Sequence, residues 1–319
     1  MVFFLGTYFE LVEENKMEFQ IKIKAKNSFF KKAKSINMNE IIDKLGFELG
    51  SYNDAYVLQL GEARENTCIL YNPKCMGRGI YLDIRKLKDE NEITLSYNIP
   101  TTKTEINDFF LLANEIINGF GEVELYNDDE TFTIENLFEQ KDTMIAFSLA
   151  ELNQKSSLKY NKNTYILTLA MFPYALSDEE RNTFSLATSL DEFEKRLHEV
   201  QLQDVYYAMP NLYHEENRDI NIAVYTLTED CRSAFPLDGC SSLITLKLNT
   251  QIDVPWVRFY IYSENRLIDG HFEYKHFIEF VKERSQEYLD KEHIIIPALN
   301  KEEITAMADH LKESGYLVV

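Results

Sequence analysis

The densest group of potential metal ligands in the sequence is Asp269, His271, Glu273 and His276, which lie within one short stretch. Imidazoles and carboxylates are ligands that divalent transition metals prefer. His271 and His276 are separated by five positions, which places them on different faces of a helix, whereas a spacing of about four would let them converge. We therefore expect exposed turn residues here, and predict neither a metal nor a cofactor for the chain.

A polar stretch with a cysteine follows a predicted strand at residues 228–233. Arg232 next to Cys231 favours the thiolate, whereas Glu229 and Asp230 oppose it. No histidine is nearby in the sequence, so a catalytic base would have to be brought in by the fold. We expect a polar loop in which Asp230 and Arg232 are candidate binding residues.

Glycines flank an arginine at Gly77, Arg78 and Gly79, and a strand is predicted to follow. A phosphate-binding loop needs glycines that open a helix, because the N–H groups of the first helical turn bind the anion. We therefore interpret residues 75–79 as a turn. The sequence contains no nucleophile elbow, Walker loop or zinc-protease motif, and no catalytic residue is assigned.

One predicted strand carries large aromatic and cationic side chains at alternate positions: Trp256, Arg258, Tyr260 and Tyr262. Alternation places these side chains on one face of a sheet, and tryptophan, tyrosine and arginine dominate the hot spots of protein interfaces. Val257, Phe259 and Ile261 occupy the opposite face and are the better core candidates. If the first face is exposed, it is a binding surface; if both faces are covered, it is core.

The elements that position these residues are predicted from helix-start signals and apolar periodicity. Five capping boxes predict helix starts, with the pairs Asn37/Glu40, Thr102/Glu105, Ser177/Glu180, Ser189/Glu192 and Asn300/Glu303. Gly46, Gly119 and Gly315 are placed to end three of these helices. A further long helix is predicted over residues 134–152.

Short apolar runs with β-branched and aromatic residues predict strands, over residues 55–60, 67–71, 79–84, 92–98, 165–170, 205–209, 220–227, 243–248 and 257–262. Runs of strands interrupted by a few helices favour an α+β fold with two packed units of mostly antiparallel sheet. The polar residues 153–163 suggest a boundary between domains at 17–155 and 156–319. Strand periodicity begins at Met17, so residues 1–16 are interpreted as an extension that is not native, with Met17 as the natural start.

Composition restricts the function classes. The chain has 319 residues, and its 33 lysines and arginines against 53 acidic residues give a net charge of −20. This charge disfavours binding to nucleic acid or to anionic membranes and favours fast association with a basic partner. Four cysteines without a Cys-x-x-Cys pair suggest reduced thiols in a cytoplasm.

The chain resembles a bacterial family that is catalogued as a domain of unknown function and whose members are acidic proteins of similar length. The resemblance lies in residues 167–174 with 177–180, 225–231 and 257–264. The resemblance implies a bacterial cytoplasmic protein and brings no catalytic residues. The leading hypothesis is a protein-binding module that neutralises a basic partner, as immunity proteins neutralise toxic nucleases. The alternative is a hydrolase-type enzyme whose site in the C-terminal domain uses some of Asp230, Cys231, His271 and His276.

Overall fold

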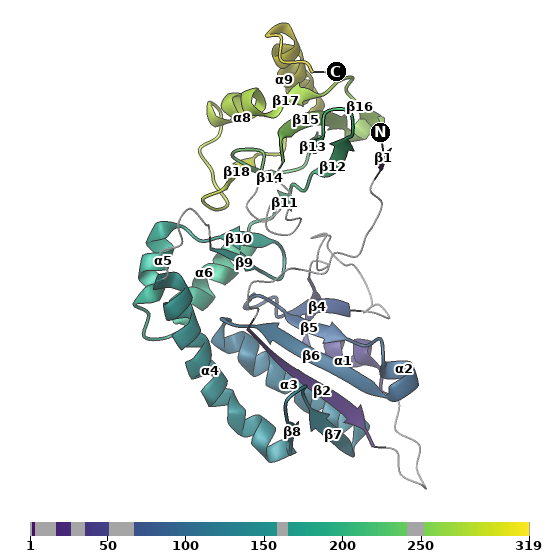
Figure 1. The fold of residues 1–319 in the computed structure, drawn as a ribbon, viewed down its shortest axis with the longest axis vertical. Coiled ribbons are helices and arrows are strands. Elements are labelled where there is room, and N and C mark those ends of the chain that lie inside the picture. Colours follow the sequence, from purple (N-terminus) through teal and green to yellow (C-terminus); the bar gives the residue numbers. More distant parts are fainter. Residues whose placement is uncertain are drawn as a thin grey trace.

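The structure is a computed structural model that describes residues 2–3, 17–26, 36–50, 67–157, 165–240 and 252–318. Figure 1 shows the N-terminal sheet in purple and blue and the C-terminal sheet in green at the opposite end of the molecule. The fold is α+β with mostly antiparallel sheets, as predicted. The strands predicted at residues 55–60 and 243–248 lie outside the described residues.

The N-terminal sheet has seven strands, and each pair of neighbours is antiparallel. Across the sheet they are β3 (Glu48–Leu49), β4 (Thr67–Tyr71), β5 (Ile80–Asp83), β6 (Glu92–Asn98), β2 (Glu18–Ala25), β7 (Val123–Tyr126) and β8 (Thr131–Phe132). Ile21 and Ile23 of β2 are fully buried, whereas the alternate residues Lys22 and Lys24 are only partly buried. The alternation predicted from Met17 onward is therefore present.

Helices α1 (Met38–Leu45) and α3 (Lys103–Phe120) lie behind this sheet in Figure 1. The short helix α2 (Leu87–Glu90) contacts β6, and α4 (Ile134–Ser157) packs on α3 and β8. Helix α3 packs on β2 and β6 and continues through Gly119, the predicted stop, to a cap at Gly121. Helix α4 continues past residue 152 into the stretch predicted as a linker, so the chain leaves the first unit as a helix.

Two short strands and two helices follow α4 and pack against its C-terminal half. They are β9 (Ile166–Thr168), β10 (Pro173–Ala175), α5 (Asp178–Ser185) and α6 (Asp191–Gln201). The predicted capping box of Ser177 and Glu180 is complete. The box predicted at Ser189 is wrong: Leu190 takes the cap position of α6 without a side-chain hydrogen bond, and its side chain is buried in the core.

The C-terminal sheet has six strands. They are β1 (Val2–Phe3), β12 (Asn211–Glu215), β13 (Ile220–Thr228), β15 (Val254–Ile261), β16 (Arg266–Leu267) and β17 (Phe272–Glu273), of which the last two both pair with β15. Strands β13 and β15 are parallel, and the other pairs are antiparallel. A smaller sheet beside it contains β11 (Tyr206–Tyr207), β14 (Ser233–Pro236) and β18 (His293–Ile296).

Helices α8 (Tyr274–Lys282) and α9 (Lys301–Glu313) pack against β15. Helix α9 begins with the complete capping box predicted for Asn300 and Glu303. Its buried residues Ile304, Met307 and Leu311 belong to the same core cluster as the buried face of β15. None of the helices in the described ranges has the length and apolar character needed to cross a membrane.

Candidate protein-binding face

Strand β15 has two chemically different faces, in agreement with the predicted alternation. Val257, Phe259 and Ile261 are each 0% exposed in the core beneath α8 and α9. Trp256, Arg258 and Tyr260 occupy the opposite face and are only partly buried. At these three positions the opposite face is only partly covered, whereas Val224 of the neighbouring strand, in register with Trp256, is 2% exposed.

The strands on either side of β15 extend this face. Strand register places Thr226 of β13 next to Arg258 and Thr228 next to Tyr260, and Leu267 of β16 opposite Tyr260. Strand β17 places the exposed Glu273 opposite Trp256. We call the surface formed by these side chains the outer face; its members are Thr226, Thr228, Trp256, Arg258, Tyr260, Tyr262, Leu267, His271 and Glu273. It combines aromatic rings with hydroxyl groups and a guanidinium.

Arg258 lies at the centre of the outer face. Its Nε donates a hydrogen bond to Oγ1 of Thr226, with an N–O distance of 2.9 Å. The ring centroids of His271 and Trp256 are 5.6 Å apart. Burial and the nearby Arg258 guanidinium lower the pKa of His271 below its ordinary value of 6.5. The imidazole is therefore neutral at pH 7, and Arg258 supplies the positive charge of this region.

Two tyrosines extend the outer face beyond the end of β15. The Tyr260 hydroxyl donates to Oδ1 of Asn265 at 2.5 Å. Tyr262, in a short 3₁₀ turn (Tyr262–Glu264), is 72% exposed, and its ring centroid is 6.5 Å from that of Tyr260. Leu267 is 43% exposed. Large side chains with apolar surface are thus accessible beside Arg258.

The structure does not gather all the predicted binding residues on this face. Asp230 is exposed in a left-handed conformation (φ 55°), and its N–H donates to the carbonyl of Leu299 at 2.8 Å. Arg232 pairs with Glu287 near the smaller sheet. Cys231 accepts a hydrogen bond from Ser233 at 3.5 Å, and no described histidine contacts its sulfur. The cysteine loop therefore shows no nucleophile–base pair.

The four potential metal ligands also separate. His276 lies on α8, where its Nε2 is 3.2 Å from Glu273 and its Nδ1 is 3.0 Å from Glu279. The His276 ring stacks on Tyr316, with ring centroids 3.6 Å apart, whereas His271 faces Trp256. Within the part of the chain that the structure describes, no group of three or more potential ligands is arranged to hold a metal ion.

Sequence reasoning missed a buried carboxylate–imidazole–phenol chain. Nδ1 of His293 is 2.8 Å from Oδ1 of Asp290, and Nε2 is 2.8 Å from the Tyr207 hydroxyl. The other carboxylate oxygen of Asp290 accepts the N–H of Ala175 at 2.9 Å. All three side chains are at most 7% exposed. Their hydrogen bonds join β10, β11 and β18 in the interior, and substrate cannot reach them in this arrangement.

The turn with Arg78 has a larger role than the sequence suggested. Arg78 is 8% exposed and donates hydrogen bonds to the carbonyl and hydroxyl of Thr168 and to the carbonyl of Pro100. Glu105 accepts the N–H of Gly79 at 2.5 Å and the hydroxyl of Thr101. Burial raises the pKa of Glu105 to about 7. The hydrogen bonds of Arg78 connect the turn before β5 to Thr168 of β9, and Glu105 holds the same turn through the Gly79 N–H.

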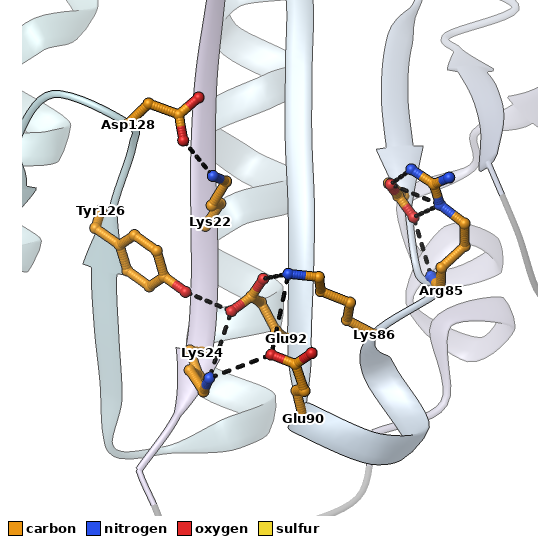
Figure 2. A network of polar contacts seen from close by, with 9 residues as sticks. Lys22, Lys24, Arg85, Lys86, Glu90, Glu92, Tyr126 and Asp128 are labelled. Carbon is orange, nitrogen blue, oxygen red and sulfur yellow. Dashed lines mark hydrogen bonds and ion pairs between the residues drawn. The ribbon is translucent and has the colours of Figure 1, made fainter.

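The outer side of the N-terminal sheet carries several cations, and Figure 2 shows that carboxylates neutralise them locally. Lys22 pairs with Asp128, and both Lys24 and Lys86 pair with Glu92, at 3.6 Å and 3.3 Å. Burial opposes ionisation of Glu92, but hydrogen bonds from Tyr126 and Lys86 lower its pKa overall. The charged groups of this network pair with one another, so the network is a weaker candidate for a binding site than the outer face of the C-terminal sheet.

Most of the chain matches a protein-family model. Residues 17–307 match the model of the domain of unknown function DUF4299. The match begins at Met17, where strand periodicity also begins. No curated protein and no solved structure matches the chain.

Proposed function

The chain belongs to the DUF4299 family, and we propose that it is a protein-binding module that engages a basic protein through the outer face of its C-terminal sheet. In this role it acts as an acidic neutraliser, as immunity proteins act on toxic nucleases. We place it in the cytoplasm, because Cys68, Cys75 and Cys231 are thiols rather than disulfides.

The observation that carries this proposal is the difference between the two faces of β15. A strand that lay between two cores would have apolar residues on both faces. Here the core face is completely buried, and the other face presents Trp256, Arg258 and Tyr260, with the exposed Tyr262 beyond the strand. The aromatic residues supply large contact areas with little loss of side-chain entropy, and tryptophan, tyrosine and arginine dominate interface hot spots.

The charge of the chain indicates the class of partner. A net charge of −20 attracts cationic proteins and accelerates their association at low ionic strength. The same charge repels nucleic acids and anionic lipid surfaces. A basic protein is therefore the partner that the whole molecule favours.

A hydrolase has less support. Its candidate residues Asp230, Cys231, His271 and His276 make separate contacts and do not meet at one point. An acid–base or nucleophilic mechanism needs groups within hydrogen-bond reach of one another or of one reacting atom. The carboxylate–histidine–phenol chain of Asp290, His293 and Tyr207 is enclosed in the interior, and His276 lies between the carboxylates of Glu273 and Glu279, without a nucleophile beside it among the described residues.

Affinity purification from cells that produce the chain tests the proposal. The baits are the wild type, Trp256→Ala and, as a control, Tyr288→Ala, which removes a tyrosine that is 45% exposed beside β18. We expect wild type and control to retain one basic protein at low salt and release it at high salt, because salt screens charge attraction. Trp256→Ala, checked for folding by circular dichroism, should retain much less. Equal retention by all three baits, or no basic protein at either salt, would contradict the proposal.

A further inference from the structure

Arg258 has no carboxylate partner among the described residues and also lacks the set of neutral acceptors that the buried Arg78 finds on Thr168 and Pro100. The arginines that form ion pairs with Asp or Glu are Arg85, Arg196, Arg218, Arg232, Arg266 and Arg284. Arg258 makes one hydrogen bond, from Nε to the neutral Thr226 hydroxyl. Across the described ranges, neither of its Nη groups has a carboxylate within ion-pair distance.

This arrangement is unexpected in so acidic a chain. Carboxylates outnumber cationic side chains by 53 to 33, so an arginine on the surface has many potential partners. Yet Arg258 is partly buried on a sheet, between Trp256, Tyr260 and the neutral His271. A guanidinium in partly desolvated surroundings gains strongly from a second, bidentate acceptor. Among the described residues, the outer face therefore holds a cation whose Nη groups have no carboxylate acceptor.

We infer that the protein partner presents an aspartate or glutamate carboxylate that pairs with the Nη groups of Arg258, while Trp256, Tyr260 and Tyr262 pack around the pair. This inference rests on the proposed function. A carboxylate fits better than a phosphate, because a dianionic phosphate would bring more negative charge than a carboxylate toward a chain of net charge −20. The aromatic rings would exclude water from the pair and strengthen it.

The pair would give the interface a selectivity that net charge cannot provide. A uniformly acidic molecule attracts any basic surface, so long-range attraction does not distinguish one basic protein from another. A cation at the centre of the outer face rejects a lysine or arginine placed opposite it and accepts a carboxylate. Specificity commonly depends on such a repulsive element combined with an attractive one. The partner is thus basic overall and carries an acidic residue at the contact with Arg258.

Selection from a display library of random peptides of about a dozen residues tests the inference. The full chain is immobilised as wild type, Arg258→Gln or Arg258→Lys, with Tyr288→Ala as the control, and circular dichroism verifies that each variant is folded. Binding of single peptides is then followed by the fluorescence of Trp256, which is the only tryptophan in the chain. Each selected acidic peptide is also made with Gln or Asn in place of its Glu or Asp.

We expect wild type and Tyr288→Ala to select basic peptides that share one acidic position. Amidation of that position should weaken binding to wild type by about tenfold or more and leave binding to Arg258→Gln almost unchanged. Arg258→Lys should keep only part of the preference, because its ammonium cannot form the bidentate pair. Basic peptides that perturb Trp256 without any acidic preference would overturn the inference and leave the proposed function standing. If no selected peptide perturbs Trp256, both fail.

Discussion

The guanidinium of Arg258 disfavours protonation of the His271 imidazole on the outer face, and Trp256 lies close enough to His271 to report its charge state. A protonated imidazole quenches a neighbouring indole, so Trp256 fluorescence should fall as pH decreases through the pKa of His271. Burial and Arg258 hold this pKa below 6.5. Because Arg258→Gln removes the repelling charge, we predict a higher midpoint in that variant. A fluorescence pH titration measures both values.

Arg258→Lys is the matched variant for this titration, because it retains the positive charge on the strand. Its midpoint should stay closer to that of the wild type. Identical midpoints in wild type, Arg258→Gln and Arg258→Lys would show that the two side chains are not electrostatically coupled.

Glu105 predicts a pH dependence of stability. Its pKa of about 7 in the fold lies above its ordinary value of 4.5, so between these values the folded state holds a proton that the unfolded state has lost. The free energy of unfolding therefore falls as pH rises from 4.5 to 7, and the loss is complete above pH 7. Glu105→Gln cannot ionise, and its amide can still accept from Gly79 and donate to Thr101.

When pH rises from 5 to 8, the free energy of unfolding of Glu105→Gln should increase relative to that of the wild type by roughly 2–4 kcal/mol. Urea denaturation at both pH values measures the difference. The exposed Glu302→Gln on α9 serves as a control and should track the wild type. If the difference in free energy of unfolding between the wild type and Glu105→Gln does not change with pH, Glu105 is not protonated in the fold.

Residue patterns in the sequence were informative where the contacts are local and uninformative where they join distant segments. The alternation of Trp256, Arg258 and Tyr260 with apolar residues predicted the two faces of β15. The hydrogen bond between Tyr207 and His293 connects positions that no sequence spacing relates. Arg78 looked like a turn residue because its acceptors, on Thr168 and Pro100, reach it only through the fold.

Among the elements, helix starts were predicted best where the capping residues have no competing contact. Ser177 and Asn300 form complete boxes with their glutamates. Thr102 caps α3 as predicted, but Glu105 bonds to Gly79 and Thr101 instead of the cap backbone. The sequence cannot show that diversion, because Gly79 comes from another part of the sheet.

The cap of α9 supports the sheet that carries the outer face. Asn300→Ala removes the acceptor for the Glu303 N–H, at 2.9 Å, and should lower the free energy of unfolding by about 1 kcal/mol. Ser189→Ala is the matched control, because that serine is exposed, lies outside the cap position of α6 and makes only a longer contact, 3.3 Å, with the Asp191 N–H. It should change stability by only a few tenths of a kcal/mol. Equal effects of the two substitutions in urea denaturation would contradict this assignment of caps.

In the whole molecule, the α+β class and the mostly antiparallel sheets followed from the order of predicted strands and helices. The predicted domain division at residues 153–163 stays a prediction, although α4 extends to Ser157. Contacts of Arg78 with Thr168 and of Gln201 with the Gly77 carbonyl, at 2.8 Å, tie the N-terminal sheet to the elements after α4. Sequence alone could not decide whether the aromatic face was covered, because this depends on how the layers pack.

The most direct test of the binding face is the affinity of the purified chain for the basic protein that it retains, measured by calorimetry at physiological salt. Tyr262 is 72% exposed and Tyr288 is 45% exposed, so alanine at either position should leave the fold intact. We predict that Tyr262→Ala weakens binding by about tenfold or more, whereas Tyr288→Ala binds like the wild type. Wild-type affinity in Tyr262→Ala and Trp256→Ala alike would show that the partner binds elsewhere.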